Sequence, residues 1–284
     1  MFGGAPPPPP AFGERSPSPC REGSVATAAH TVLTTADPRA KALAARKAAR
    51  EWLAGRLAFT FDLTMPDRPA RPEAPELLPP NRMPKRGRLG STRGQIAMLH
   101  AVANIEFNAI DLAFDIIGRF GHQFPRAFTD DWLRVGAEEA AHFALVARRL
   151  RALGAAYGDL PAHDGLWEAA EETRHDALAR LAIVPMVLEA RGLDVTPAIR
   201  DRFAALGDTR SATVLDRILS DEIGHVATGV RWFRTACATQ GFEPEALWHD
   251  LVARHFRGAL KPPFNDSARD QAGLSRDFYA VVAR

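Results

Sequence analysis

The sequence has few cysteines, few tyrosines and no long apolar run. Cys20 and Cys237 are its only cysteines among 284 residues, and they lie far apart without forming a CxxC pair. This pattern argues against a disulfide framework and against a structural zinc site. It fits a protein of the reducing cytoplasm, which is the location we expect.

Membrane and export signals are also missing from the sequence. No run of eighteen apolar residues could span a bilayer, and the first twenty residues, MFGGAPPPPPAFGERSPSPC, lack the apolar segment of a secretory signal. The formal net charge of +2 is too small to make the whole chain a polyanion binder. We therefore expect a soluble protein with no membrane partner.

The first ninety residues fall into two parts that differ in composition. Residues 1–25 are rich in Pro, Gly and Ser, so we expect a disordered tail that cannot repay the entropy of ordering. Residues 26–90 should hold a basic helix from Asp37 to about Ala58 and then a proline-rich strap. Seven prolines within 66–84 forbid helix interior and sheet core alike, which predicts an extended segment lying over the main body.

The rest of the chain has helical periodicity and no period-two alternation. Residues 91–240 predict an all-α four-helix bundle, and 241–284 predict a C-terminal helical extension. The expected helices run over 91–118, 125–153, 165–191 in two pieces, and 209–238. Pro185 should kink the third of these, the segment GLDVTP should end it, and PAIRDRFAAL should form a short separate helix.

Each of the four helices places one glutamate in the middle of its apolar stripe. The neighbours of Glu106 at intervals of three and four residues are all apolar, and the same holds closely around Glu139, Glu189 and Glu222. Two helices add a histidine at i+3 on the same side, in the motifs Glu139-x-x-His142 and Glu222-x-x-His225. The predicted core therefore contains six residues that are unusual there: Glu106, Glu139, His142, Glu189, Glu222 and His225.

Metal binding explains this arrangement. A buried carboxylate costs several kcal/mol unless it has a partner, and the stripes contain no Lys or Arg. Four glutamates balance the charge of two divalent ions, and oxygen with imidazole donors suits iron or manganese better than tetrahedral zinc. One Glu from each of two helices and a Glu-x-x-His from each of the other two is the ligand pattern of di-iron carboxylate bundles.

Spacing strengthens the prediction. Glu106 to Glu139 and Glu189 to Glu222 are both thirty-three residues, so the chain reads as two copies of one helix pair. The alternative is that these residues lie at solvated helix ends. Glu138 and Asp221 turn about 100° away from the stripe, so we expect them to be solvated or to support the ligands. His100 is expected to be a satisfied core or surface residue, with a supporting role as the alternative, and His122, His163 and His175 are not expected to be ligands.

The pattern resembles the ferritin-like superfamily. The phrases IEFNAIDLAFD, DWLRVGAEEAAHF, VLEARGLDVTP and EIGHVATGVRWF, over about residues 37–265, resemble a bacterial ferritin-like family of unknown function. That family is similar to the tRNA hydroxylase that acts on 2-methylthio-isopentenyladenosine. The resemblance implies a ferritin-like bundle in which Glu106 and Glu189 are terminal ligands, Glu139 and Glu222 bridge two iron ions, and the two histidines complete one ion each. It implies no substrate.

Several functions are open to a di-iron bundle. The only tyrosines, Tyr157 and Tyr279, lie outside the predicted ligand helices, which argues against a tyrosyl-radical subunit, and two cysteines cannot build a four-cysteine iron site. We expect an O2-dependent hydroxylase or oxidase of an unknown substrate, with no catalytic residues beyond the metal ligands. A modified tRNA nucleoside and a small metabolite are the candidate substrates. The alternative is a non-catalytic iron-binding, ferroxidase or structural di-metal protein. An iron and manganese pair is an alternative to two irons.

Partners are also predicted. The chain has no flavin or nicotinamide fingerprint, so an external electron donor is required. Residues 39–56 and 82–94 are strongly basic, and tRNA contact through them is the less favoured alternative to solvated basic faces.

Overall fold

The computed structural model describes residues 23–283, and these residues are mostly helical. The only named strands are β1 (Gly23–Ser24) and β2 (Leu57–Ala58), which pair in parallel and tie the start of the described chain to the end of the second helix. The predicted all-α class is confirmed. The predicted tail 1–25 lies outside the described residues up to residue 22, and its last three residues belong to β1 and to the start of α1.

The helices follow one another with short connections over most of the chain. Their bounds are α1 Val25–Thr34, α2 Pro38–Leu53, α3 Thr92–Phe120, α4 Arg126–Ala152, α5 Gly165–Glu172, α6 Ala177–Ile183, the π-helical η3 Val184–Glu189, α7 Ala190–Ala205, α8 Thr209–Gln240, α9 Pro244–His255, α10 Asp266–Gln271 and α11 Arg276–Tyr279. Short 3-10 turns occupy η1 Pro80–Arg82 and η2 Gly121–Gln123.

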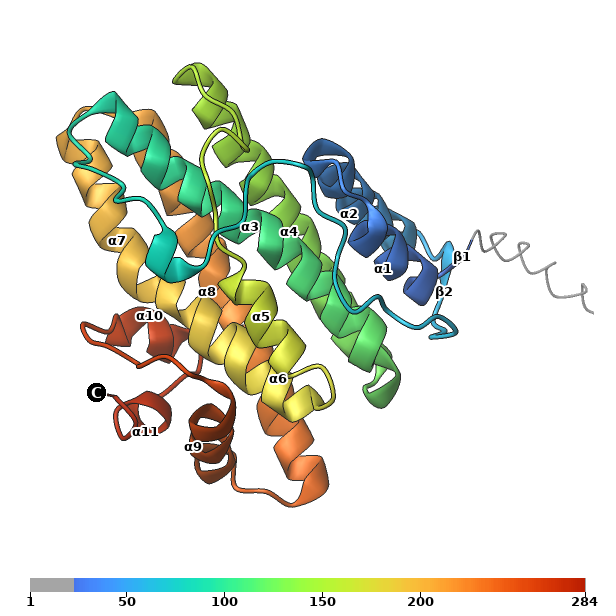
Figure 1. Ribbon diagram of the computed structural model, residues 1–284. Helices are drawn as coiled ribbons and strands as arrows, with labels where there is room; N and C mark the ends of the chain where they lie inside the picture. The colour runs from blue at the N-terminus through green and yellow to red at the C-terminus, as the bar shows by residue number, and fades with distance from the viewer. Residues whose placement is uncertain (1–22, 284) are drawn as a thin grey trace, which may run out of the picture.

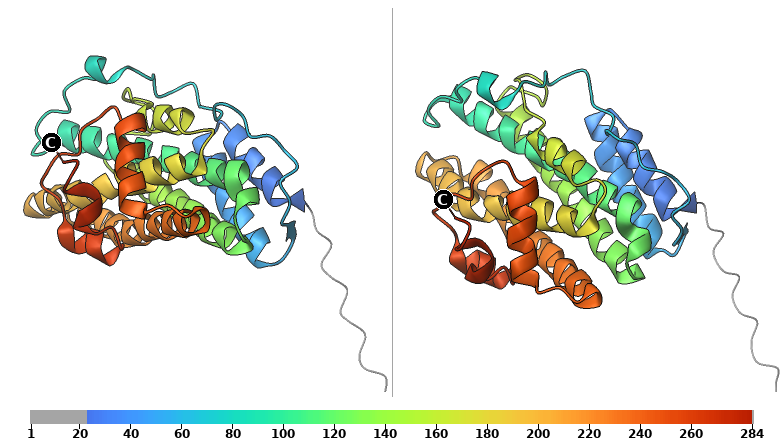
Figure 2. Two further views of the ribbon diagram at one scale, coloured as in Figure 1. Left: turned by 90° about the horizontal axis from the view of Figure 1, so that it is seen from below. Right: turned by 60° about the horizontal axis from the view of Figure 1, so that its bottom comes forward.

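The long helices form the centre of the molecule. Helix α3 packs against α4, η3 and α7 pack against α8, and α4 packs against α8. Helices α1 and α2 cover α3 and α4, whereas α9 and α10 lie against the α6 to α8 side (Figure 1). The two sets of added helices therefore cover opposite sides of the central helices (Figure 2).

Side-chain caps begin several of these helices. Asp37 accepts a hydrogen bond from the Ala40 N–H with Pro38 in the first turn, and Ser91 accepts one from Gly94. Asp208 does the same for the Ser211 N–H at the start of α8. Each of these caps satisfies an N–H group that has no partner within its helix.

The proline-rich segment is extended and lies over the body as predicted (Figure 2). Its Arg71 donates to Asp111 of α3 at 2.6 Å, and its Pro66 carbonyl accepts from Arg119 at 2.9 Å. Lys41 of α2 reaches the same Asp111 and also the Ala70 carbonyl. The strap is thus attached by charged groups that are largely buried, and by an isolated parallel backbone bridge between Leu77 and Ala162.

The helix predictions were wrong at three places. The basic helix expected to reach about Ala58 ends at Leu53, and Leu57–Ala58 form β2. Helix α1 was not expected, although Ser24 caps it by accepting from the Thr27 N–H. The segment GLDVTP does not end a helix, because α7 continues through Pro197. Proline removes the N–H that would bond the Leu193 carbonyl, and that carbonyl instead accepts from Asn265 Nδ2 at 3.1 Å. The expected kink at Pro185 takes the form of the π-helical segment η3.

One described stretch, Thr92–Gln123, is long and apolar enough to cross a membrane, but 72% of its apolar window is buried inside the protein. Such burial fits the core helix of a soluble protein. The cytoplasmic location stays a prediction.

Candidate metal centre

The six predicted residues come from four helical segments and gather in the core. Glu106 lies on α3, Glu139 and His142 on α4, Glu189 at the end of η3, and Glu222 and His225 on α8. One ligand atom from each of Glu106, Glu139, His142 and Glu222 lies within 4.8 Å of the others. This buried group of glutamates and histidine could hold a metal ion.

Glu139 stands between the two histidines. Its Oε1 is 2.8 Å from His225 Nδ1, and its Oε2 is 3.5 Å from His142 Nδ1. Glu222 Oε2 is 3.7 Å from His225 Nδ1, and Glu106 Oε2 is 3.2 Å from His142 Nδ1. The same nitrogen of each ring, Nδ1, therefore faces the carboxylates.

Every one of the six residues has a buried polar atom without a hydrogen-bond partner. These atoms are Glu106 Oε2, both Glu139 oxygens, His142 Nδ1, Glu189 Oε2, Glu222 Oε2 and His225 Nδ1. Seven of the twelve such side-chain atoms among the described residues thus lie in this cluster. Unpaired buried polar atoms are costly, and their concentration in one place fits a site built to bind cations.

The acid groups of the cluster have strongly perturbed pKa values. Burial raises the pKa of Glu106 to about 7 and that of Glu189 to about 8, and it raises the pKa of Glu222 well above its ordinary value. Burial also opposes ionisation of Glu139, but His225 and His142 outweigh it and lower the pKa of this carboxyl. Without metal, protons must neutralise part of this charge.

The histidines carry the complementary perturbation. Burial disfavours their charged form, yet Glu106 and Glu139 raise the pKa of His142 to about 12, and Glu139 with Glu138 raises that of His225 well above its ordinary value. Two divalent cations would supply the positive charge that protons supply here, and would leave neutral imidazoles to donate Nδ1 lone pairs. The donor set fits iron or manganese.

The outer nitrogen of each histidine is bound by the other motif. His142 Nε2 lies 2.9 Å from Asp221 Oδ2, and His225 Nε2 lies 2.9 Å from Glu138 Oε2. Asp221 and Glu138 each precede the cluster glutamate of their own helix. The two motifs are therefore joined crosswise, and each ring orientation is held from the neighbouring helix.

An arginine one turn earlier holds each of these outer carboxylates. Arg217 Nε donates to Asp221 at 2.6 Å, and Arg134 Nη1 donates to Glu138 at 2.9 Å. The sequence predicted that Glu138 and Asp221 are either solvated or support the candidate ligands. These contacts fit the second of the two roles. Their pairing across helices was missed, although Arg134 and Arg217 are separated by the same eighty-three residues as the two motifs.

The other histidines discussed from sequence have their own partners. His100 is buried, its Nε2 accepts from the Gly158 N–H at 3.0 Å, and its ring stacks on Tyr157. His163 Nδ1 accepts from the Gly165 N–H, His175 pairs with Arg174, and His122 packs against Phe61. None of these four joins the cluster, which agrees with their predicted roles.

A cavity of about 200 Å³ reaches the cluster from the side of α3, α7 and α8. Glu106, Glu189 and Glu222 line it, and most of its other lining residues are apolar. Glu189 is partly exposed as a residue even though its Oε2 is buried, since it faces this cavity. The carboxylates are thus accessible to a small molecule from one side.

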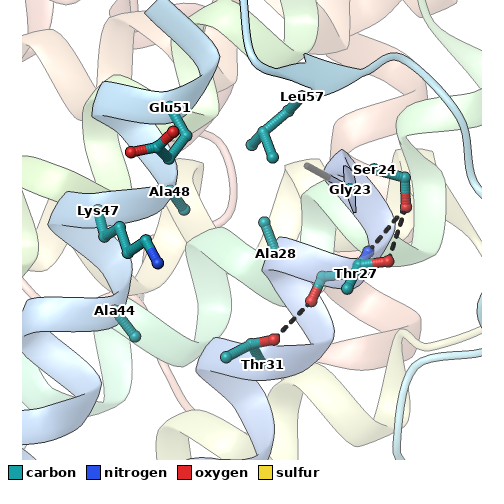
Figure 3. Close-up of a pocket in the computed structure, with 10 residues that line it drawn as sticks. All are labelled: Gly23, Ser24, Thr27, Ala28, Thr31, Ala44, Lys47, Ala48, Glu51 and Leu57. Carbon is teal, nitrogen blue, oxygen red and sulfur yellow. Dashed lines mark hydrogen bonds between the residues drawn. The ribbon is translucent and has the colours of Figure 1, made fainter. Parts of the chain in front are cut away.

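A second hollow lies between α1, α2 and β2 (Figure 3). Its volume is about 150 Å³, and none of the six cluster residues lines it. The Thr31 hydroxyl donates a hydrogen bond to the Thr27 carbonyl, and the Ser24 and Thr27 hydroxyls are hydrogen-bonded to each other. The hydroxyl groups that line the hollow therefore already have partners. We assign no chemistry to this hollow.

Comparison with known proteins places the chain in a family. The family model described as "Protein of unknown function (DUF455)" matches residues 34–280, which include all six cluster residues. The chain belongs to the DUF455 family. An uncharacterized protein of Haemophilus influenzae is 43% identical to this DUF455 chain over 213 residues, which cover 73% of the chain and 74% of that protein. No solved structure matches the chain. The family supplies no reaction, so function rests on the site.

Proposed function

We propose that this DUF455 chain is a ferritin-like four-helix bundle that binds two iron ions, with an iron and manganese pair as the alternative. Glu106, Glu139, His142, Glu189, Glu222 and His225 would hold them. The supporting observation is the set of seven unpaired buried atoms contributed by these six residues. The two oxygens of Glu139, one toward each histidine, support the proposal that this residue would be shared by both ions.

The reaction that we propose is O2-dependent hydroxylation or oxidation of an organic substrate. When bound, two ferrous ions supply the capacity to reduce dioxygen. Inserting one oxygen atom into a C–H bond and releasing the other as water consumes two electrons and two protons. An external donor must provide the electrons, because the chain contains no flavin or nicotinamide motif.

The residues of the chain have distinct parts in this proposal. The glutamates neutralise the cations, and Asp221 and Glu138 fix the ring orientation of the histidines through Nε2. The apolar walls of the cavity exclude water from the reacting carbon. An iron-storage protein has no need of an apolar chamber at its metal site, and this observation favours the enzyme over the non-catalytic alternative.

Metal analysis tests the proposal. Wild-type protein loaded with ferrous iron without oxygen should hold two metals per chain, whereas Glu139→Ala and Glu222→Ala should lose metal. Glu243→Ala, which removes an exposed carboxylate at the start of α9, is the control and should keep both ions. Retention of two metals by the Glu139→Ala variant would refute the ligand assignment.

Oxygen exposure separates the functions. An oxygenase should take up oxygen in proportion to its iron and stop, whereas a storage protein should accumulate many irons per chain. A structural site should retain metal and consume no oxygen. Contact with tRNA stays a prediction from the basic segments 39–56 and 82–94, and salt-dependent binding of tRNA would support it.

A further inference from the structure

The cavity beside the cluster has a charge distribution that restricts its ligand. Its inner part carries Glu106, Glu189 and Glu222, and its remaining charged lining residues are Arg86 and Arg191. Arg86 is exposed and the Arg191 side chain is 43% exposed, whereas Glu106 and Glu222 are buried. The arginines therefore mark the solvent side of the cavity and the carboxylates its floor.

Apolar side chains occupy the space between floor and mouth. Leu112, Leu215 and Ile218 are buried in the wall, and Ile105 is 48% exposed near the opening. An engineered apolar cavity of about 150 Å³ can hold benzene. A cavity of about 200 Å³ lined in this way suits an apolar ring or chain of about six carbons.

The charge of Arg191 is only partly cancelled, because Arg191 shares its one carboxylate partner, Asp194, with Arg269. Its Nη1 donates to the Lys261 carbonyl at 2.8 Å, which positions the guanidinium but adds no negative charge. It also lies 3.3 Å from Asp194, but that carboxylate is already bound by the buried Arg269 at 2.7 and 2.9 Å. Arg86 forms no ion pair with a carboxylate among the described residues. The mouth is therefore cationic.

We propose that the cavity binds a small amphiphilic anion, a carboxylate or phosphate monoester, with its apolar part against the cluster and its anionic group at Arg86 and Arg191. This assignment of substrate class rests on the proposed function for the chemistry that follows binding. A neutral ligand gains nothing from the two arginines, and a cationic ligand is repelled by them.

Binding of a matched series tests the proposal without requiring turnover. The probes are hexanoate, hexyl phosphate, 1-hexanol and hexylamine, titrated by calorimetry into the manganese(II)-loaded protein. One or both anions should bind at least about tenfold more tightly than hexanol, and hexylamine should bind least. The preferred anion identifies the head group, and equal affinity of hexanol and both anions would overturn the proposal.

Two arginine variants locate the anionic group. Arg86→Gln and Arg191→Gln should each reduce the preference for the anion over hexanol, while Arg88→Gln, an exposed arginine of the same connection, should not. Unchanged anion preference in both cavity variants would mean that the head group binds elsewhere, for example on the metal. That outcome would reject the proposed orientation.

Gly192 allows the cavity to be filled without disturbing its walls. It lines the cavity on α7, and a Cβ added there meets nothing within 4 Å. Gly192→Phe should abolish binding of every probe and leave the metal content unchanged. Ala204→Phe, on the exposed part of the same helix, is the control, and Gly192→Leu replaces the larger variant if that one unfolds. Undiminished binding in a folded Gly192 variant would exclude this cavity.

The two proposals fail in different ways. Selective anion binding without any oxygen uptake by the ferrous protein would retain the cavity assignment and reject the oxygenase. Stoichiometric oxygen uptake without selectivity for an anion would do the reverse.

Discussion

The central helices form two pairs, α3 with α4 and the η3–α7 segment with α8. The two pairs share one residue pattern but differ in backbone structure at the candidate metal centre. Residues of α3 and α4 recur in η3, α7 and α8 at a constant offset of eighty-three. Glu106, Asp111, Arg134, Glu138, Glu139 and His142 correspond to Glu189, Asp194, Arg217, Asp221, Glu222 and His225. In the first half Glu106 lies within a regular α-helix, whereas in the second half Glu189 ends a π-helical segment.

Some features are common to both helix pairs, and others are found in one pair alone. Both halves present a glutamate, an outer carboxylate and a histidine in the same arrangement. The first half lines the cavity with residues of the regular helix α3. The second half lines it with residues of the π-helical segment η3 and of α7 and α8. π-helical segments occur frequently at functional sites. The shared residues thus form the buried group that could hold a metal ion, and the irregular backbone lies in the wall of the cavity that reaches it.

Asp111 and Asp194 are the strongest test of the correspondence. Each follows its cluster glutamate by five residues and binds a buried cation from an added part of the chain: Lys41 of α2 for Asp111 and Arg269 of α10 for Asp194. Replacing either aspartate with Ala leaves that cation unpaired. We expect each variant to lose about 3–5 kcal/mol of unfolding free energy in urea denaturation. Asp216→Ala, an exposed control on α8, should cost less than about 0.5 kcal/mol.

A pH series distinguishes the two aspartate variants. Burial lowers the pKa of Lys41 in the folded chain, and loss of Asp111 removes a group that opposes this. A lysine whose folded pKa lies below its unfolded value binds fewer protons when folded, so stability rises with pH. The deficit of Asp111→Ala should shrink between pH 7 and 10. That of Asp194→Ala should persist, because it leaves an arginine unpaired and arginine side chains stay charged in proteins. Parallel pH curves would contradict this account.

Two glycines give the next largest expected difference. A Cβ at Gly229 of α8 would lie 2.3 Å from Pro185 Cβ, and one at Gly136 of α4 would lie 2.6 Å from Phe114 Cε2. The proline ring is held in the backbone of η3, whereas the phenylalanine can rotate. Gly229→Ala should therefore cost about 3 kcal/mol and Gly136→Ala about 1 kcal/mol in urea denaturation. Gly192→Ala, with open space at its Cβ, should be neutral or stabilising. A larger cost at Gly136 would mean that η3 yields more easily than α4.

Sequence patterns predicted the regular helices well and the irregular ones poorly. The expected bounds of 91–118, 125–153 and 209–238 lie close to those of α3, α4 and α8, because their apolar stripes are local signals. The continuation of α7 through Pro197 depends on Asn265, seventy-two residues from the carbonyl that it satisfies. No local pattern contains that contact.

At the candidate site, too, some features follow from local sequence patterns and others depend on contacts between distant parts of the chain. Helical periodicity was enough to select Glu106, Glu139, Glu189 and Glu222, since each stands in an apolar stripe. The contacts of Glu138 and Asp221 with the histidines cross from one helix to another, and periodicity within a helix cannot predict them. The cavity likewise follows from how α3, α7 and α8 pack. Local spacing selected the candidate residues, while tertiary packing determines which groups contact them and where the cavity reaches them.

The outer carboxylates test whether the halves support each other. Asp221→Asn should weaken the ion held by His142, and Glu138→Gln should weaken the ion held by His225, each by about 10–100-fold. Stepwise titration with cobalt(II), followed by absorption, should show one of two binding steps displaced in each variant. Asp216→Asn on α8 serves as the control. Loss of both steps in a folded variant, or of neither, would contradict the crosswise support.

The smallest expected effect concerns how the corresponding helices α4 and α8 begin. Helix α4 follows Pro125 without a side-chain cap, whereas Asp208 caps α8, accepting from Ser211 and from Arg149 at 3.0 Å. Burial opposes ionisation of Asp208, but Ser211 and Arg149 outweigh it and lower its pKa below 3.8. A lowered folded pKa adds stability above about pH 4, which is lost as the pH falls through the folded value. Asp208→Asn should therefore cost about 1 kcal/mol at pH 6 and less at pH 3 in urea denaturation. If the cost of Asp208→Asn does not change with pH, the cap stabilises α8 through its hydrogen bonds and not through the charge of the carboxylate.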